Sequence, residues 1–67
     1  MKSKFTERLK ELRAESGLTQ KQLAENLNVC KSAVSAWEIG RNQPDYDLLI
    51  DIADFFKVSV DFLVGKD

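Results

Sequence analysis

Apolar residues near the start of the chain recur at the spacing of a helix. Phe5, Leu9 and Leu12 are separated by four and three residues, so a helix carries them on one face and leaves charged residues on the other. Gly17 follows this pattern, and glycine adopts the left-handed conformation that ends many helices at low cost. The pattern predicts a first helix from Ser3 to Ser16.

A second helix is predicted by the chemistry of its start. The hydroxyl of Thr19 can accept a hydrogen bond from the backbone N–H of Gln22, and the Gln22 side chain can return to the backbone of Thr19. The apolar face of this helix consists of Leu23, Ala24 and Leu27. Asn28 tolerates the left-handed conformation, which predicts a turn of about three residues before another helix.

The third helix is predicted from Lys31 to Ile39, ending at Gly40, with two different faces. At about 100° per residue, Ala33, Val34 and Trp37 point to one side. The opposite side carries Lys31, Ser32, Ser35, Ala36 and Ile39. We therefore expect the apolar side, Trp37 included, to pack in the core and the other side to remain accessible.

The last part of the chain predicts two more helices. Pro44 forbids a helix through the loop from Gly40 to Asp45. An apolar stripe then predicts an amphipathic fourth helix, with Tyr46, Leu49, Ile52, Ala53 and Phe56 on the buried side. Ser59 can cap a short fifth helix that contains Val60, Phe62 and Leu63 and ends at Gly65. The predicted fold class is all-α, with five helices and no strand.

Length and composition narrow the class of protein. A chain of 67 residues, 43% apolar and 31% charged, has the size and balance of one folded globular domain over residues 1–67. It has no apolar run of the ~20 residues that a membrane span needs, and residues 1–10 are charged throughout instead of resembling a secretion signal. We expect a soluble, cytoplasmic protein without membrane contact.

The composition also argues against catalysis and metal binding. The chain has no histidine, which is the commonest general base and metal ligand, and its single cysteine, Cys30, cannot form an internal disulfide. A chain this short also leaves little volume for a substrate pocket. We expect no enzyme activity, no metal and no cofactor.

Charge is distributed unevenly along the chain. The net charge of −1 is not typical of a nucleic-acid-binding domain. Residues 1–31 nevertheless carry seven basic and four acidic side chains, whereas residues 32–67 carry three basic and seven acidic ones. Because only charges within about 8 to 10 Å act strongly on a polyanion at physiological salt, a basic face can operate on an acidic protein.

The second and third predicted helices have the spacing of a helix-turn-helix, a motif that places its second helix in the DNA major groove. The segment 18–41, LTQKQLAENLNVCKSAVSAWEIGR, resembles the Cro and lambda-repressor type of DNA-binding domain, also called Xre-like. The resemblance extends roughly from Phe5 to Gly65 and includes Leu12-Arg13, Gln43-Pro44, Ile52-Ala53 and the segment 58–61. It implies a compact five-helix domain with this motif at its second and third helices.

The resemblance also implies which residues contact DNA. Base contacts are expected from the start of the third helix, at Lys31, Ser32, Ser35 and Ala36. Phosphate contacts are expected from the first turn of the second helix and from side chains and backbone amides of the loop, at Gln20, Lys21, Arg41, Asn42 and Gln43. The alternative at each position is a solvated side chain without a contact, or, in the loop, a residue required for turn geometry.

Two further positions follow from the resemblance. The family pairs an arginine and a glutamate at the places of Arg13 and Glu38, which implies a partly buried ion pair that orients the third helix. At Cys30 the chain departs from the family, which prefers serine or threonine as the helix N-cap, because a thiol is a weak acceptor. A redox role for Cys30 and a tolerated small residue both stay open.

The function expected from these features is that of a sequence-specific transcriptional regulator, a repressor that occupies a near-palindromic operator. Apolar residues beside the main stripe suggest a homodimer surface, at Leu48, Phe55, Phe62 and Val64. The alternative for this surface is that it only encloses the core of one chain. The alternative function is an Xre-like protein-binding module that acts through its fourth helix and C-terminal surface.

Overall fold

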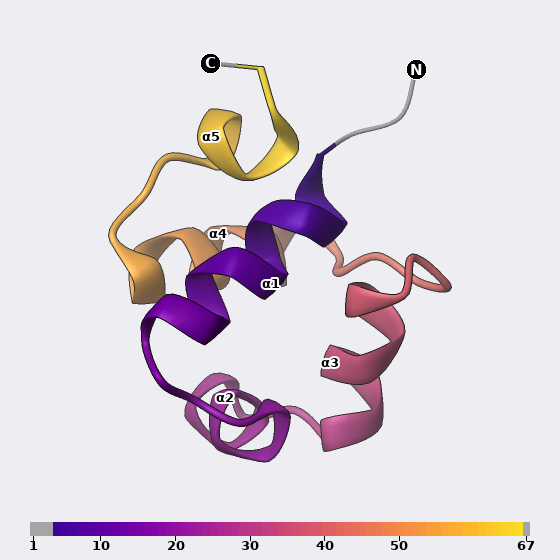
Figure 1. Ribbon diagram of the computed structural model, residues 1–67. Helices are drawn as coiled ribbons and strands as arrows, with labels where there is room; N and C mark the ends of the chain where they lie inside the picture. Colours follow the sequence, from indigo (N-terminus) through magenta and orange to yellow (C-terminus); the bar gives the residue numbers. More distant parts are fainter. Residues whose placement is uncertain (1–3, 67) are drawn as a thin grey trace.

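The computed structural model describes residues 4–66, which form five helices and no strand (Figure 1). The helices are α1 (Phe5–Glu15), α2 (Gln20–Leu27), α3 (Lys31–Glu38), α4 (Tyr46–Phe56) and α5 (Val60–Val64). The all-α fold class and the order of the helices confirm the prediction from periodicity. The longest helices have 11 residues, and none of the described helices is long and apolar enough to cross a membrane.

The capping signals in the sequence are confirmed. The Thr19 hydroxyl accepts from the Gln22 backbone N–H at 3.0 Å, and the Gln22 side chain accepts from the Thr19 backbone N–H at 2.9 Å. Asn28 ends α2 in the left-handed conformation with φ of 63°, and Gly17 follows α1 with φ of 71°. Local hydrogen bonding and backbone freedom therefore set these boundaries.

The bounds of α1 and α3 differ from the prediction, and the end of α4 had no prediction. α1 begins at Phe5 with Lys4 as N-cap, and Ser3, where we expected its start, lies outside the described residues. α3 ends at Glu38 with Ile39 as C-cap, one residue earlier than predicted. α4 ends at Phe56, and its C-cap Lys57 is left-handed with φ of 58°. Lysine carries no signal for that conformation, so the sequence did not reveal this end.

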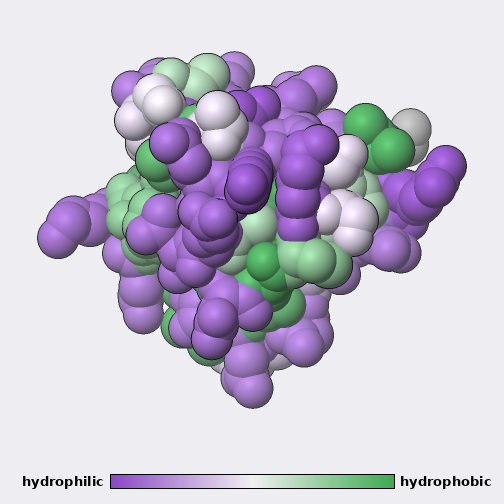
Figure 2. All heavy atoms as spheres, turned by 90° about the horizontal axis from the view of Figure 1, so that it is seen from below, coloured by the Kyte–Doolittle hydropathy of each residue, from purple (hydrophilic) through white to green (hydrophobic). Residues whose placement is uncertain are grey.

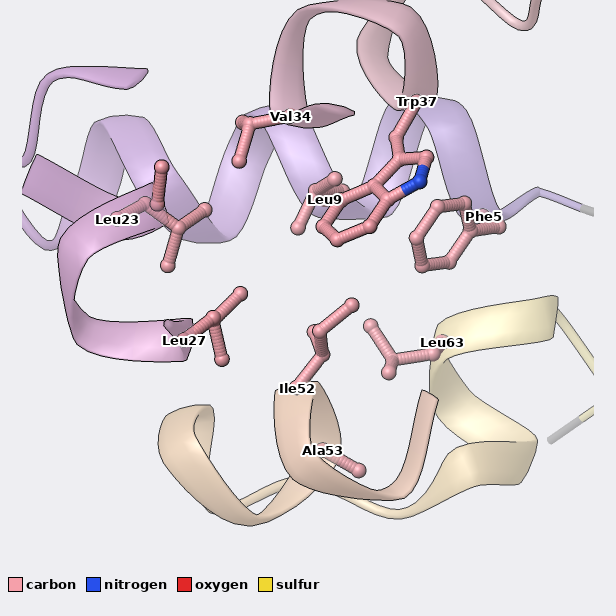
Figure 3. Packing of buried hydrophobic residues seen from close by; sticks show 10 residues of the cluster. Phe5, Leu9, Leu23, Leu27, Val34, Trp37, Ile52, Ala53 and Leu63 are labelled. Atoms are coloured by element: carbon pink, nitrogen blue, oxygen red, sulfur yellow. The ribbon is translucent and has the colours of Figure 1, made fainter. Parts of the chain in front are cut away.

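All five helices contribute to one apolar core (Figure 3). Its buried side chains are Phe5, Leu9, Leu23, Ala24, Leu27, Val34, Trp37, Ile52, Ala53 and Leu63. The Trp37 indole lies between the helices beside Leu9 and Phe5 in this view, which confirms that it is a core residue. Burial of a large aliphatic side chain contributes about 1.5 to 3 kcal/mol to the free energy of unfolding. The buried Val34 and Trp37 therefore fix the inner face of α3 in the core.

Tyr46 was predicted on the buried side of α4, and this prediction is wrong. Its side chain is 74% exposed, whereas Ile52 and Ala53 on the same helix are buried. Tyr46 is the first residue of α4, and the helix reaches the core only from Leu48 onward. A stripe on a helical wheel cannot tell where along its length a helix begins to touch its neighbours.

The start of α1 is attached to α5. The Lys4 backbone N–H donates to the Val64 carbonyl at 3.2 Å, and Arg8 Nη1 donates to the Phe62 carbonyl at 2.9 Å. The Arg8 guanidinium also lies 4.2 Å from the centre of the Phe62 ring. These contacts close the domain at the end opposite α2 and leave the α2–α3 pair at the other end (Figure 1).

The caps of α3 and α5 supply a test of how the thiol affects helix stability. Cys30 has the extended backbone of an N-cap but its side chain makes no capping hydrogen bond, whereas Ser59 accepts from the Phe62 N–H at 2.9 Å. Cys30→Ser should raise the free energy of unfolding by about 0.5 to 1 kcal/mol, because serine restores an acceptor. Urea unfolding measures this change. Ser59→Cys is the matched reverse exchange and should lower stability; equal stability of both variants and the parent chain contradicts this account.

Candidate nucleic-acid interface

The helices α2 and α3 are joined by three residues and pack directly against each other. In this turn Asn28 is left-handed, and the Val29 backbone N–H donates back to the Ala24 carbonyl at 3.0 Å. The chain therefore leaves α2 sharply and enters α3 at Lys31. This arrangement is a helix-turn-helix, with the turn length predicted from the sequence.

The outer face of α3 is open at its beginning. Lys31 and Ser32 are exposed, whereas Ser35 and Ala36, one turn further on, are half-buried. Lys31 makes no ion pair with any of residues 4–66, so its ammonium group remains available. Of the four candidates for base contacts, the structure thus presents two at the accessible first turn and two deeper on the same helix.

The loop after α3 places three candidate side chains at the end of that helix. Arg41, Asn42 and Gln43 are all exposed. The backbone N–H groups of Arg41 and Asn42, however, donate to the Ala36 carbonyl at 2.9 and 3.4 Å. In these two residues the backbone amide thus already donates to a carbonyl of α3, and phosphate contact of the loop stays a prediction. Their side chains stay available.

The first turn of α2 contributes two more candidates. Lys21 is exposed, and Gln20 is half-buried. The Gln20 side-chain amide donates to Glu38 Oε1 at 2.9 Å, a bond that no local sequence signal indicated. One N–H of that amide remains for an outside acceptor, so contact of Gln20 with a phosphate stays a prediction.

Arg13 and Glu38 form a bidentate ion pair between α1 and α3. Arg13 Nε donates to Glu38 Oε2 at 2.5 Å, and Nη2 donates to Oε1 at 3.0 Å. A third guanidinium nitrogen, Nη1, donates to the Leu18 carbonyl at 2.8 Å. The Glu38 side chain is only 3% exposed and that of Arg13 22%, so the carboxylate depends on these partners instead of water.

The surroundings of Glu38 change its pKa in opposing ways. Burial raises the pKa of the Glu38 carboxyl, but the hydrogen bonds from Arg13 and Gln20 and the charges of Arg13 and Lys10 lower it, and the result lies below the usual 4.5. The hydrogen bond to Glu38 raises the pKa of Arg13 above its ordinary value. Both groups are therefore charged in the folded chain at neutral pH.

The two helices of the helix-turn-helix differ from the other three in the acidic residues of their first turns. α1, α4 and α5 each carry an acidic residue in the first turn, Glu7, Asp47 and Asp61 respectively. α2 and α3 carry none. The N-terminal ends of α2 and α3 therefore keep the partial positive charge of their free N–H groups. The face seen from below in Figure 1, on the side of α2, is mostly hydrophilic, with apolar atoms only in scattered patches (Figure 2).

The candidate dimer-surface residues have different surroundings. Leu48 packs against the core, and Phe62 lies under the Arg8 guanidinium of the same chain. Val64 is half-buried, and Phe55 is 37% exposed with its ring edge-on to Phe56. The stacking of Arg8 on Phe62 joins residues far apart in the sequence, and no spacing rule predicted it.

Cys30 is exposed directly before the first turn of α3. Its Sγ lies 3.1 Å from Ser32 Oγ. The hydrogen bond with Ser32 lowers the pKa of this thiol below its usual value. Among residues 4–66, no three or more histidine, cysteine, aspartate or glutamate side chains lie close enough together to hold a metal ion.

The fold and the turn between α2 and α3 define a helix-turn-helix domain, and comparison with known proteins agrees. A family model described as helix-turn-helix matches residues 9–63. The chain belongs to this helix-turn-helix family, of the Cro/C1 type. A transcriptional regulator from Listeria innocua superimposes with a TM-score of 0.91 and 40% identity, over 97% of this chain and 61% of that one.

Two further matches are similar in sequence to this chain. The transcriptional activator BcrR of Enterococcus faecalis is 44% identical over 63 residues, which are 94% of this chain and 31% of BcrR. The transcriptional regulator ImmR of Bacillus subtilis is 43% identical over 90% of this chain and 47% of ImmR. The chain thus spans about a third to a half of the length of these relatives.

The lowered pKa of Glu38 predicts how stability changes with pH. The unfolded chain binds a proton at Glu38 near pH 4.5, and the folded chain does so only at lower pH. The ionised pair therefore contributes its full stability above pH 4.5 and loses it as the pH falls through the folded pKa. In urea unfolding, the stability difference between the parent chain and Glu38→Gln should shrink below pH 4.5. A difference that stays constant or grows there contradicts the assignment.

Proposed function

We propose that this chain is a sequence-specific transcriptional regulator that acts in the cytoplasm and reads double-stranded DNA with α3. The observation that carries the proposal is the accessible first turn of α3, with Lys31 and Ser32 outward, on a helix whose inner face is fixed in the core by Val34 and Trp37. A rigid helix with a free polar end is what major-groove recognition requires.

Phosphate contacts on both sides of α3 set its register on the duplex. Lys21 and the remaining N–H of Gln20 act from the start of α2, and the side chains of Arg41, Asn42 and Gln43 act from the loop after α3. The ends of α2 and α3 assist, because their first turns contain no carboxylate to compete with a phosphate. These contacts attract any duplex and position the protein without reading sequence.

Sequence is read by the outer face of α3. The Lys31 ammonium donates to guanine O6 or N7, and the Ser32 hydroxyl both donates and accepts. Ser35 and Ala36, which are half-buried, come within reach only when the helix is seated in the groove, where the Ala36 methyl meets a thymine methyl. The buried pair of Arg13 and Glu38 keeps this face in one orientation.

Repression requires no contact with a further protein, since a domain bound at the operator excludes RNA polymerase. Among the similar solved structures, a LexA protein from Eubacterium rectale is named a transcriptional repressor, with a TM-score of 0.85 and 27% identity over 90% of this chain and 64% of the chain in that structure. BcrR is named an activator. We therefore propose regulation through operator binding, with repression as its direct effect.

We further propose that two copies bind one near-palindromic operator. A two-fold homodimer sets its α3 helices one DNA turn apart, about 34 Å, and so reads two half-sites. Phe55, with its exposed ring, and Val64 provide apolar surface for this contact. Leu48 and Phe62 take a smaller part, because both already pack within their own chain.

A protein-binding module is less well supported than DNA binding. That function would act through α4 and α5, where Tyr46 and Phe55 are the large apolar side chains exposed among residues 4–66, and the proposed dimer contact already uses Phe55. A tight protein partner together with weak, salt-insensitive binding to DNA is the result that favours this alternative.

The proposed roles of Lys31 and Arg41 predict different defects. Selection of random duplex DNA on the purified protein, followed by sequencing, should enrich an inverted repeat with half-sites about 10 bp apart. Lys31→Ala should cost about 1 to 3 kcal/mol on the selected site and relax preference at one position. Arg41→Ala should weaken binding to all sequences alike and reduce the slope of log K against log[salt] by about one.

Lys66→Ala is the matched control, because Lys66 is an exposed cation that follows α5, away from α3. It should leave both the affinity and the preference unchanged. Identical behaviour of the Lys31 and Arg41 variants contradicts the assigned division between reading and positioning. Failure of the parent chain to enrich any sequence contradicts sequence-specific binding itself.

A further inference from the structure

The last turn of α3 is held by α1 at a second point, besides the ion pair. The Thr6 hydroxyl donates to the Trp37 backbone carbonyl at 3.2 Å, in a half-buried contact between residues 31 positions apart in the sequence. Trp37 belongs to the final turn of α3, whose last carbonyls have no partner within a helix. Thr6 therefore caps α3 from outside, across the helix interface.

We propose that Thr6 is a positioning residue that sets the direction of α3, and through it the sequence specificity of the domain. Thr6 and Arg13 lie about two turns apart on one face of α1, and both hold the final turn of α3. Core packing and the ion pair already restrict α3, and attachment at a second point along the rigid α1 restricts its direction further. The hydroxyl supplies the second point.

The distance between the attachment and the reading residues explains why direction affects specificity. Six residues separate Trp37 from Lys31, so the first turn of α3 lies about 9 Å from the attached turn at 1.5 Å per residue. A pivot of about 10° moves Lys31 by more than ~1 Å, while recognition geometry must be held within about 0.5 Å. Small changes at Thr6 are thereby amplified at the bases.

The loop after α3 depends on the same turn. The Ala36 carbonyl accepts from the backbone N–H groups of Arg41 and Asn42, and the Trp37 carbonyl also accepts from Gly40 at 3.3 Å. A pivot of α3 therefore carries the candidate phosphate contacts of the loop with it. The Gly40 bond also means that loss of the Thr6 hydroxyl leaves the Trp37 carbonyl with one partner, so the fold is not strongly destabilised.

The test compares Thr6→Val, which keeps the shape and removes the hydroxyl, with Thr6→Ser, which keeps the hydroxyl. Ser16→Ala is a matched control, since it removes an exposed hydroxyl at the end of the same helix. Residual dipolar couplings of backbone amides in α1 and α3 measure the angle between the helices in each variant. The ratio of affinities for the selected site and for a scrambled duplex measures specificity.

In Thr6→Val, the couplings should indicate a changed direction of α3, the affinity ratio should fall about tenfold, and the midpoint of thermal unfolding should move by less than about 5 °C. Thr6→Ser and Ser16→Ala should match the parent chain in all three. Couplings of Thr6→Val that fit the parent structure overturn the proposal. A changed direction with an unchanged ratio overturns the role in specificity.

The effect on specificity rests on the proposed DNA-binding function, whereas the direction of α3 does not. If the parent chain prefers no DNA sequence, the proposed function fails, and with it the role of Thr6 in specificity. The dipolar couplings still decide whether Thr6 positions α3. The two failures are therefore distinguishable.

Discussion

The carboxylate of Glu38 is the constraint around which the domain is arranged. A charge this deeply buried has lost most of its water, and it is tolerated only where hydrogen bonds and an opposite charge replace that water. Arg13 on α1 supplies the opposite charge together with hydrogen bonds, and Gln20 on α2 supplies a further hydrogen bond. Because Glu38 itself belongs to the last turn of α3, its carboxylate links the three helices directly.

This constraint divides α3 into a fixed and a free end. Its last turn is held by the ion pair, by the Thr6 hydroxyl and by the packing of Trp37, whereas its first turn projects Lys31 and Ser32 outward with no acidic neighbour in that turn. A recognition element needs this combination, because a free end contacts bases and a fixed end determines which bases it contacts.

How far the sequence could predict the structure depended on the range of each interaction. The capping box at Thr19 and the left-handed Asn28 are local features, so residue types and spacing were sufficient to place them. The ion pair of Arg13 and Glu38 was expected only through resemblance to a family. The bonds of Gln20 to Glu38 and of Thr6 to α3 had no signal, because a hydroxyl or amide can bond to many partners and only the folded chain selects one.

The central claim is that Arg13 and Glu38 stabilise the domain as a coupled, buried pair. A double-mutant cycle with Arg13→Met, Glu38→Met and the double variant, measured by urea unfolding at pH 7, tests it most directly. We predict that each single change costs about 3 to 5 kcal/mol and that the coupling energy is about 2 to 3 kcal/mol. A coupling energy below about 0.5 kcal/mol, the value typical of an exposed pair, would contradict the account.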